Sequence, residues 1–562
     1  MVQFSLGLML FFASFTPCLG LSPVSSPTNS TESLLAKASE LIDAGRYLEA
    51  EQVLREALQM EPEAVEGYFL LGLVLAKQEK WLVSRESLER VITLDPQHGR
   101  AYTELAGIEF KLGNRTEATR NLRQAEKLSS DTEYVRTFLA TLLYLENRKT
   151  EALYYWNKAG APRVDQISYN TSATVAPELL QRLFPLNEGE VFRRKQMLDI
   201  RWKQERFRLG SPFSWQLTPR GIDIYELNIA LASGSNVSSL KLVLLENAVS
   251  APLYREVSIE YPMTLRSGKR IAGRFRWDEP RKRVQVSAWL PFVSSSSDGL
   301  GLGLDLRDEH WSDRLSGTEF LFEARKTLAS YELLFEGRKS LALRGGYENQ
   351  KLFLPEPSNL PEDSHFAILG TGWNQGVGLN ASDDFQLQIA ADLDGFFGYG
   401  AEGSRSGRGR AAVELGWVFE QRSRSECRLT FGGGYASSTV PLDHYFILGI
   451  GQDDPLPLRA HPAVDRGRKG NSPMGRQYVL ANLELRRRVL SWRFLEIRGL
   501  LFSDTALVDG APFSDVGGQW FQDVGFGLSL GALGQERIEV LFGFDLKDSS
   551  FNLWVGIPLV PF

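Results

Sequence analysis

The chain has 562 residues, with 63 lysines and arginines against 69 aspartates and glutamates, and its formal net charge is −6. This length predicts more than one domain, at roughly 100–200 residues per domain. The hydrophobic content of 43%, the 51 glycines and the two cysteines exclude a disordered chain, a collagen-like repeat and a disulfide scaffold. The acidic balance, without a long basic run, argues against nucleic acid as a partner.

Residues 1–20 differ from the rest of the chain. An uncharged apolar run over residues 4–15 precedes Cys18-Leu19-Gly20, which offers small residues before a cleavage point. This pattern is typical of a secretory signal peptide, although the usual basic start is missing and a short buried helix is the alternative. After cleavage only Cys427 remains, so no intrachain disulfide can form. No later stretch has the roughly 18 apolar residues of a spanning helix, so a secreted chain of this kind would cross a membrane as a closed β-barrel.

The next 130 or so residues repeat with a period of 34, which predicts paired helices over residues 33–162. Small residues recur where two helices approach closely, and larger apolar residues fill the space between pairs. The small positions are Ala38, Gly72, Ala106 and Ala140, and then Ala50, Ser84, Ala118 and Ala152; the larger ones are Leu54, Leu88, Leu122 and Trp156. The pattern resembles four tetratricopeptide (TPR) repeats. Gly45, Gly113 and Asn147 occupy the turn between the paired helices, and Glu79 is the departure.

Stacked repeats of this kind form a curved α-solenoid whose inner surface can hold an extended segment of another protein. We therefore expect the repeats to dock a partner, here a periplasmic protein. The alternative is that the repeats only space the neighbouring domains, because a fold does not determine a function.

Residues 163–235 lose the period and predict a small α+β module. A short helix is expected at residues 177–183, a turn at 187–190, a longer helix at 193–207 and a strand at 223–230. The turn Gly189-Glu-Val-Phe192 resembles that of polypeptide-transport-associated (POTRA) domains. One extra residue between Gly210 and Phe213 departs from the family pattern, and a generic linker is the alternative.

Residues 250–562 consist of short alternating runs separated by Gly, Ser, Asp and Asn. The run 537–545 alternates Ile, Val and Phe with Glu, Gly and Asp, which suits a wall with lipid outside and water inside, although a soluble sandwich gives similar alternation. An even number of such runs permits an antiparallel barrel without open edges. We therefore predict a 16-stranded antiparallel transmembrane β-barrel, with strands near 269–277, 283–291, 299–308, 319–325, 331–338, 340–347, 366–373, 385–393, 410–419, 427–435, 445–451, 478–486, 494–507, 521–531, 537–546 and 551–559.

Two motifs near the C-terminus are more specific. A long loop carrying Pro457-Leu458-Arg459-Ala460-His461 follows the eleventh predicted strand, and Phe502-Ser503-Asp504 lies in the thirteenth. This order resembles the BamA/TamA superfamily of outer-membrane assembly barrels, the bacterial surface antigen family, whose members carry Val/Leu-Arg-Gly-Tyr/Phe in that loop and Phe-x-Asp in that strand. The resemblance implies a bacterial outer-membrane barrel that acts in protein assembly or translocation. Ala460-His461 departs from the family pattern, so a differently shaped loop tip is expected.

Arg459, Glu484, Phe502 and Asp504 are the candidate site. Strand parity places the last three on one face, which we assign to the lumen. Two carboxylates in a confined lumen repel each other unless a cation lies between them, and the Arg459 guanidinium can bond both. Phe502 is expected to pack against the folded loop. With the resemblance, these residues are predicted to hold the loop inside the barrel; without it, an ordinary ion pair that steadies the wall is the simpler interpretation.

The last predicted strand bears on the seam between the first and last strands. Gly556 and Pro558 weaken its hydrogen-bond ladder, because Gly packs no side chain and Pro donates no N–H. The resemblance implies that a loosely closed seam opens and pairs with a client strand.

Catalytic and metal motifs are weak. Gly527-Leu-Ser529-Leu-Gly531 matches the nucleophile pattern G-x-S-x-G, but no histidine follows it, whereas the hydrolase order places the histidine last. The five histidines form no H-E-x-x-H pair, and a single cysteine cannot build a thiolate metal site. We therefore expect no enzyme activity, no metal site and no cofactor.

These patterns together predict an outer-membrane assembly or translocation factor whose partners are outer-membrane lipid, client polypeptides and a periplasmic protein in the TPR groove. One alternative is a TPR-plus-barrel exporter of surface lipoproteins or polysaccharide, which would not need Arg459 paired with Phe-x-Asp. The other is a passive outer-membrane pore or adhesin scaffold.

Overall fold

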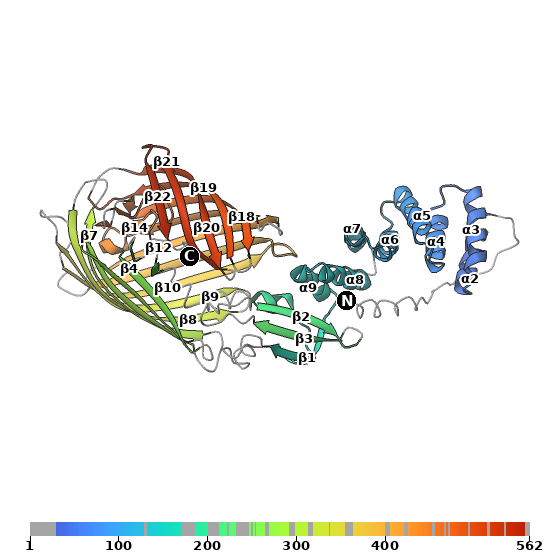
Figure 1. Ribbon diagram of the computed structural model, residues 1–562, viewed down its shortest axis with the longest axis horizontal. Helices are drawn as coiled ribbons and strands as arrows, with labels where there is room; N and C mark the ends of the chain where they lie inside the picture. The colour runs from blue at the N-terminus through green and yellow to red at the C-terminus, as the bar shows by residue number, and fades with distance from the viewer. Residues whose placement is uncertain are drawn as a thin grey trace. The chain divides into compact units, whose positions relative to one another are not determined.

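The structure is a computed structural model (Figure 1). It divides into two compact units, one mainly helical and one mainly of strands. The predicted signal peptide, the predicted helix at 177–183 and Pro558 lie outside the described residues. Those residues are 30–128, 132–170, 186–199, 213–221, 224–231, 247–248, 251–252, 255–264, 269–291, 298–312, 319–335, 338–353, 363–398, 405–420, 425–451, 456–465, 468–469, 472–492, 495–513, 517–532 and 535–556.

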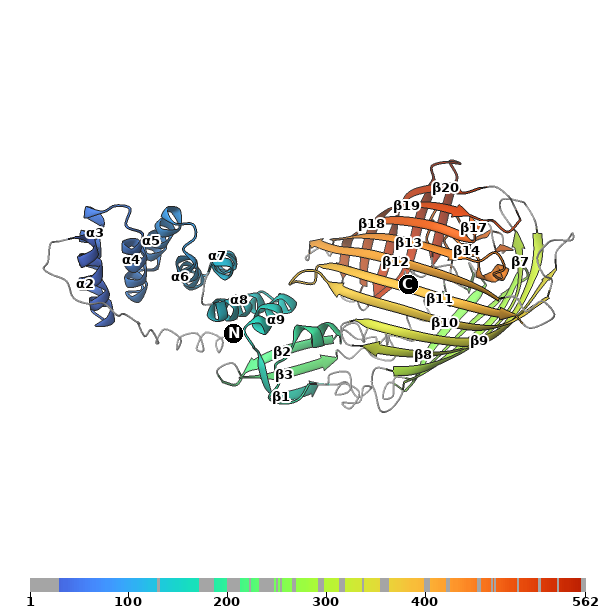
Figure 2. The ribbon, with the colours of Figure 1, turned by 180° about the vertical axis from the view of Figure 1, so that it is seen from behind.

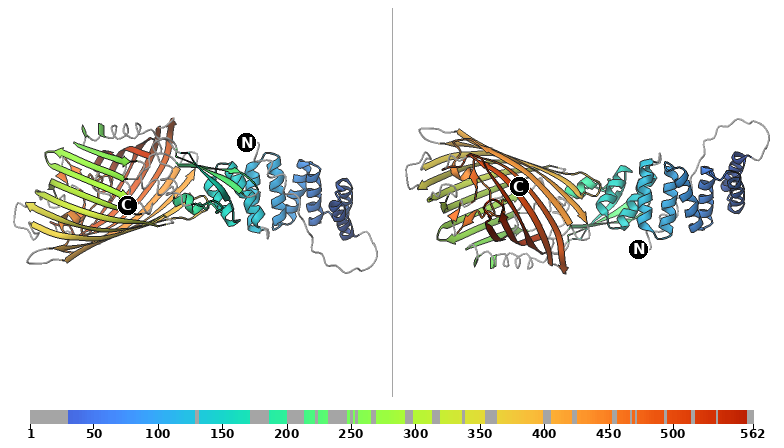
Figure 3. Two further views of the ribbon diagram at one scale, coloured as in Figure 1. Left: turned by 90° about the horizontal axis from the view of Figure 1, so that it is seen from below. Right: turned by 90° about the horizontal axis from the view of Figure 1, so that it is seen from above.

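Paired helices make up the N-terminal region, and Figure 3 shows them side by side. Each odd-numbered helix packs on the helix before it, which gives the four predicted helix pairs. Of the helices described, none has both the length and the apolar character needed to cross a bilayer. The helices are α2 Thr31–Asp43, α3 Tyr47–Met60, α4 Val65–Lys77, α5 Trp81–Leu94, α6 Gly99–Lys111, α7 Arg115–Leu128, α8 Thr132–Leu145 and α9 Lys149–Lys158.

The 34-residue period corresponds to buried contacts between helices. At Gly72, a Cβ atom would lie 2.8 Å from Cγ of Leu88, so this crossing leaves no room for a side chain. Ser84 reinforces the same crossing, because its hydroxyl donates to the Gly72 carbonyl at 2.7 Å. The predicted small alanines are fully buried, and they are Ala38, Ala50, Ala106, Ala118, Ala140 and Ala152.

The turns inside the four pairs share a left-handed backbone. Gly45, Glu79, Gly113 and Asn147 have φ values of 71°, 59°, 87° and 62°. Glycine adopts this conformation without steric cost, whereas a residue with a Cβ pays roughly 1–2 kcal/mol. Glu79, the departure from the sequence pattern, therefore takes the same turn under strain.

A three-stranded sheet follows the helices. It contains β1 Arg163–Asn170, β2 Phe213–Pro219 and β3 Ile224–Leu231 in the order β1-β3-β2. The strand predicted at 223–230 is observed as β3. Gly189, in the predicted turn, has a φ of 85°, and residues 194–199 of the predicted longer helix are helical.

The second unit is a large antiparallel sheet whose strand order closes on itself as a barrel, with β22 beside β4 (Figures 1 and 2). Fifteen long strands form its wall within the described residues. They are β4 Glu256–Thr264, β5 Lys269–Asp278, β6 Arg281–Pro291, β7 Asp298–Ser312, β8 Glu319–Phe335, β9 Lys339–Phe353, β10 Asp363–Gly378, β11 Phe385–Gly398, β12 Arg405–Glu420, β13 Ser425–Ala436, β18 Gln477–Trp492, β19 Leu495–Asp509, β20 Gln519–Ala532, β21 Gln535–Asp545 and β22 Phe551–Gly556.

This wall corrects the predicted count of sixteen strands in three places. The runs predicted at 319–325 and 331–338 form the single strand β8, because the alternation continues through the polar residues between them. The run predicted at 445–451 contributes no wall strand. The strand β4 was missed, since the prediction began at Lys269.

The barrel is apolar outside and polar inside. On β7, Leu302 and Leu304 are 46% and 40% exposed, whereas the alternating residues Asp305, Arg307 and Glu309 are buried. The same reversal recurs around the wall, with exposed Leu393, Trp417, Val479, Leu501 and Phe526 set against buried Glu348, Glu484, Asp504, Asp523 and Glu539. A water-soluble sheet packs its apolar face inward, so this pattern is the one expected of a wall in contact with lipid.

Candidate functional site in the barrel lumen

Residues 437–476 connect β13 to β18, and we call them the lumen segment, because the described residues among them (437–451, 456–465, 468–469 and 472–476) fold inside the barrel. Its described part contains the 3-10 turn η2 Leu442–His444 and the short strands β14 Phe446–Ile447, β15 Val464–Asp465, β16 Arg468–Lys469 and β17 Met474–Gly475. Strands β14 and β17 pair with each other, and Figures 1 and 2 both place β14 within the outline of the barrel. The run predicted as the eleventh strand, residues 445–451, belongs to this segment.

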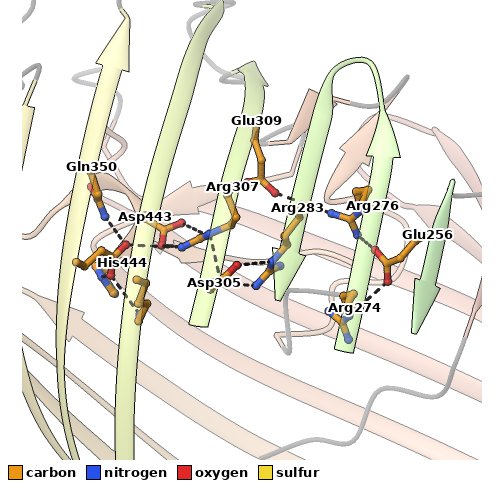
Figure 4. A network of polar contacts seen from close by, with 12 residues as sticks. Glu256, Arg274, Arg276, Arg283, Asp305, Arg307, Glu309, Gln350, Asp443 and His444 are labelled. Carbon is orange, nitrogen blue, oxygen red and sulfur yellow. Dashed lines mark hydrogen bonds and ion pairs between the residues drawn. The ribbon is translucent and has the colours of Figure 1, made fainter. Parts of the chain in front are cut away.

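The first part of the lumen segment is held by an ion pair to β7 and a hydrogen bond to β9 (Figure 4). Arg307 of β7 donates two hydrogen bonds to the Asp443 carboxylate, at 2.8 and 2.6 Å. His444 Nε2 lies 3.1 Å from Glu348 Oε2 of β9, and its ring packs against Phe396 in a tilted arrangement with centroids 4.2 Å apart. Burial alone would raise the pKa of Asp443, but Arg307 and Lys469 hold it well below its ordinary value. Asp443 is therefore a permanent anion at this anchor.

The Asp443 anchor continues into a chain of ion pairs along the wall (Figure 4). Arg307 Nε lies 3.4 Å from Asp305, and Asp305 binds Arg283 of β6 at 2.7 Å. Arg276 of β5 pairs with Glu256 of β4. The inward face of β4 to β7 is thus charged, and it binds the lumen segment through Arg307 and Asp443.

The second part of the lumen segment is held by Arg459, which lies between two carboxylates. Its Nη2 and Nε donate to Asp504 of β19 at 2.7 and 2.9 Å, and its Nη1 donates to Glu484 of β18 at 2.5 Å. The guanidinium carbon lies 4.1 Å from the centre of the Phe502 ring. Burial alone would lower the pKa of Arg459, but Asp504 and Glu484 raise it above its ordinary value. The structure therefore brings all four predicted site residues together.

The backbone of Arg459 is bound to the wall as well as its side chain. Its N–H donates to Asp504 at 3.0 Å, and Asn552 of β22 donates to its carbonyl at 3.3 Å. Gly543 of β21 makes this approach possible, since a Cβ there would lie 2.4 Å from the Arg459 carbonyl oxygen. The lumen segment can thus approach β21 this closely only because position 543 is a glycine.

Polar side chains at one level form a row across four neighbouring strands of the wall. Asn482 of β18, Asp504 of β19, Asp523 of β20 and Asp545 of β21 are successive register partners. Each of the first three binds the lumen segment: Asn482 donates to the Pro457 carbonyl at 2.9 Å, Asp504 binds Arg459, and Asp523 accepts from the Ala460 N–H at 2.6 Å. The row therefore receives the chain from residue 457 to residue 460 in order.

Apolar side chains fill the space between the two anchors. They form one buried cluster, contributed by the lumen segment (Leu442, Tyr445, Phe446, Ile447, Leu448, Leu456, Leu458 and Met474) and by the wall (Trp311, Phe320, Phe322, Phe366, Phe396, Tyr478 and Phe521, among others). Burying apolar surface is worth about 25 cal/mol per Å², so this packing adds to the ion pairs in holding the segment.

The two sets of ion pairs lie on opposite walls. In the closed strand order, β10 to β13 separate β9 from β18 on one side of the ring, and β22 to β6 separate β21 from β7 on the other. The lumen segment therefore ties together strands that do not touch each other. The side chains of the lumen segment bind the wall and brace it, and their arrangement suggests no catalytic step.

Several contacts of the lumen segment were not predicted. Asp443 and His444 are not among the predicted site residues, and their partners on β7 and β9 could not be identified without the register. His461 was noted as a departure from the family motif, and the structure places it beside Asp523 and Asp545. Of the seam residues, Gly556 ends β22, and Pro558 lies outside the described residues.

Comparisons with known proteins support the helical assignment. A tetratricopeptide-repeat family model matches residues 35–99. A search of curated proteins finds no match.

Several solved structures are similar to parts of the chain. The crystal structure of MamA is 20% identical over 23% of this chain and 77% of its own, with a TM-score of 0.23. The type III secretion translocator chaperone SycD of Yersinia enterocolitica is 17% identical over 21% and 85%, with a TM-score of 0.20. BamA of Haemophilus ducreyi, lacking POTRA domains 1–3, is 12% identical over 70% and 83%, with a TM-score of 0.39. At these values no function passes from them to this chain.

Proposed function

We propose that this protein is a bacterial outer-membrane β-barrel that assembles or translocates client polypeptides, with a periplasmic TPR array and a POTRA-like module. The apolar outer face and charged inner face of the wall support the membrane assignment. The TPR match supports binding of another protein by the helical region. The proposal assigns the barrel no catalytic chemistry.

The observation that carries the assembly role is the Arg459 anchor. The residues that resemble the assembly-barrel motifs, Arg459 and Phe502-Ser503-Asp504, meet in the lumen, where Arg459 bonds Glu484 and Asp504. Holding the lumen segment there braces β18 to β21, the strands that lead to the seam at β22. A braced wall beside a weak seam lets the seam open for a client strand while the rest of the barrel keeps its register.

The alternatives fit the lumen less well. A passive pore needs an open water path, whereas apolar side chains of the lumen segment pack against the wall between two opposite anchors. A lipoprotein or polysaccharide exporter gives no reason for the Arg459 anchor. Neither alternative therefore accounts for the contacts of Arg459 with Glu484 and Asp504.

The assembly role is tested in liposomes that contain the purified full-length protein. The probe is a small outer-membrane barrel polypeptide, unfolded in urea, whose folding is followed by its shift in gel mobility. Arg459→Lys keeps the charge but loses the two-pronged contact, and we expect it to slow probe folding at least tenfold. Arg344→Lys is the matched control, because Arg344 also binds two carboxylates, Asp392 at 2.9 Å and Asp394 at 3.0 Å, and its hydrogen bonds to described residues all go to the wall.

Equal rates for the wild type and Arg459→Lys, with both barrels folded, would refute the assembly role of the anchor. Steady single-channel conductance of the wild type without any client would favour the pore instead.

The docking role of the repeats is tested separately in cells. A photo-crosslinking residue is placed at Tyr68 or Tyr102, equivalent partly exposed positions in α4 and α6. We expect one periplasmic protein to be captured from both positions. No crosslinked product from either site would support the spacer role.

A further inference from the structure

The tip of the lumen segment carries a buried group that the anchors above do not use. His461 lies between Asp523 of β20 and Asp545 of β21, and all three side chains are at most 1% exposed. One ligand atom from each residue lies within 4.8 Å of the other two. The two aspartates are register partners, so the fold holds both carboxylates at the same level on the inner wall.

Three atoms of this cluster are buried without a hydrogen-bond partner: His461 Nε2, Asp523 Oδ1 and Asp545 Oδ2. Asp523 Oδ2 lies 3.2 Å from His461 Nδ1 and accepts from the Ala460 N–H, and Asp545 Oδ1 accepts from the Lys547 N–H at 2.9 Å. In each aspartate, one carboxylate oxygen is therefore held by a contact and the other has no partner. A buried polar atom without a partner costs about 1–3 kcal/mol, and here three lie together.

The spacing of these atoms suits a shared ion. His461 Nε2 and Asp545 Oδ2 are 3.2 Å apart, yet they are not aligned as a hydrogen bond. Two ligands of a tetrahedral zinc ion, each about 2.0–2.1 Å from the metal, lie about 3.3 Å from each other. The Nδ1 contact to Asp523 is also the one expected of a metal-bound histidine, whose other nitrogen donates to a carboxylate.

Charge favours the same conclusion. A neutral imidazole has one N–H and no charge, so it can donate to only one of the two carboxylates and leaves both of their negative charges buried. The other buried cluster of this kind, Glu348 with Asp443 and His444, differs because Arg307 and Lys326 already neutralise it. Around Asp523 and Asp545, the described residues provide no ion-pair partner except His461.

We propose that His461, Asp523 and Asp545 bind one divalent transition-metal ion of the zinc class. His461 Nε2 and Asp545 Oδ2 are the primary ligands, and Asp523 holds the imidazole through one oxygen and offers the other to the ion. One imidazole and two carboxylates form a ligand set that zinc accepts. The ion fastens the loop tip to β20 and β21, next to the Arg459 anchor on β18 and β19. This site is independent of the proposed assembly role, because it is measured by metal binding alone.

The test is metal binding by the purified full-length barrel in detergent after treatment with a chelator. Isothermal titration with zinc chloride is expected to show one site per chain with a micromolar or lower Kd. Cobalt chloride is expected to give the visible absorption of a tetrahedral ion. His461→Phe and Asp545→Asn are each expected to weaken zinc binding at least tenfold, and His365→Ala, which removes an exposed histidine on β10, leaves it unchanged.

Each result decides the proposal. Absence of saturable zinc binding by the folded wild type overturns it, as does unchanged binding by a folded Asp545→Asn variant. Loss of zinc binding in His365→Ala would show that zinc binds at this exposed histidine, and it would also overturn the proposal. Asp545→Asn keeps the shape of the side chain, so it gives an answer even if His461→Phe fails to fold; mobility in unheated gels reports folding of every variant.

Discussion

The helical repeats and the barrel bury their side chains by opposite rules. In the repeats, alanines and leucines at every 34th position are buried against the next helix in the chain. In the barrel, leucine and phenylalanine face outward, and charged residues from distant segments are buried together. The repeats are stabilised by contacts that are local in sequence, whereas Lys469 of the lumen segment pairs with Trp311 of β7, about 160 residues earlier in the chain. The two regions should therefore respond differently to single substitutions.

The largest expected effect breaks the Arg459 anchor. Arg459→Ala leaves Asp504 and Glu484 buried without their cation, and removing one partner of such a pair costs about 3–5 kcal/mol. We expect the heat-induced mobility shift of the barrel to occur at a lower temperature, with the helical signal of the repeats unchanged. Arg344→Ala should cost less, because its ion pairs are partly exposed. An equal loss in both variants would contradict the special role of Arg459.

A second substitution tests the close backbone approach. Gly543→Ala places a methyl group against the Arg459 carbonyl, and overpacking of this kind costs about 1–3 kcal/mol. The measurement is urea-induced unfolding of the barrel in detergent. Gly416→Ala is the control, since a Cβ at that position meets no other atom within 4 Å. If both alanines had the same effect, strand propensity and not docking would explain the loss.

Acidification should destabilise the barrel through His444. Burial lowers the pKa of His444, and Glu348 raises it only in part. Below about pH 6.5 the unfolded chain binds a proton that the folded chain excludes, so stability falls by up to about 1.4 kcal/mol per pH unit. The unfolding midpoint of the barrel, measured from pH 8 to pH 5, should decrease over this range, and His444→Gln should reduce the slope. An unfolding midpoint that rises on acidification would contradict this prediction.

The smallest expected effect lies in the repeats and is stabilising. Glu79→Gly removes the Cβ from a left-handed turn that already holds glycine in two other repeats. Relief of the left-handed strain, roughly 1–2 kcal/mol, exceeds the extra backbone entropy that glycine loses on folding, roughly 0.5–1 kcal/mol, so we expect a net gain of about 0.5–1 kcal/mol. Thermal unfolding followed by circular dichroism of the helices measures it. Gly113→Ala should shift the midpoint the other way. Since the turn is local, neither change should affect the barrel, and a shift in the unfolding of the barrel would show that the repeats and the barrel are coupled.

The sequence was informative where a pattern repeats or a motif is short. The TPR period located the helix pairs, because each repeat contacts only its neighbours. Parity placed Glu484, Phe502 and Asp504 on one face, and the family resemblance supplied Arg459; their role in holding the loop stays a prediction.

The register and the second anchor could not be predicted. Asp443 pairs with Arg307, which lies 136 residues away, and no local pattern relates them. Residues 445–451 alternate like a strand, but their apolar side chains pack in the lumen. The cluster of His461 with Asp523 and Asp545 depends on which residues of β20 and β21 are opposite each other, and this follows only from hydrogen bonding along the whole strands.

The level row from Asn482 to Asp545 also has a consequence for how the barrel is made. Side chains alternate between the faces of a strand, so a slip of one residue in β19 or β20 would turn Asp504 or Asp523 toward the acyl chains. The loop would then lose one of the side chains that bind it. Complete docking of the loop therefore requires the correct alignment of all four strands, and a wall with a slipped register would lack part of this stabilisation.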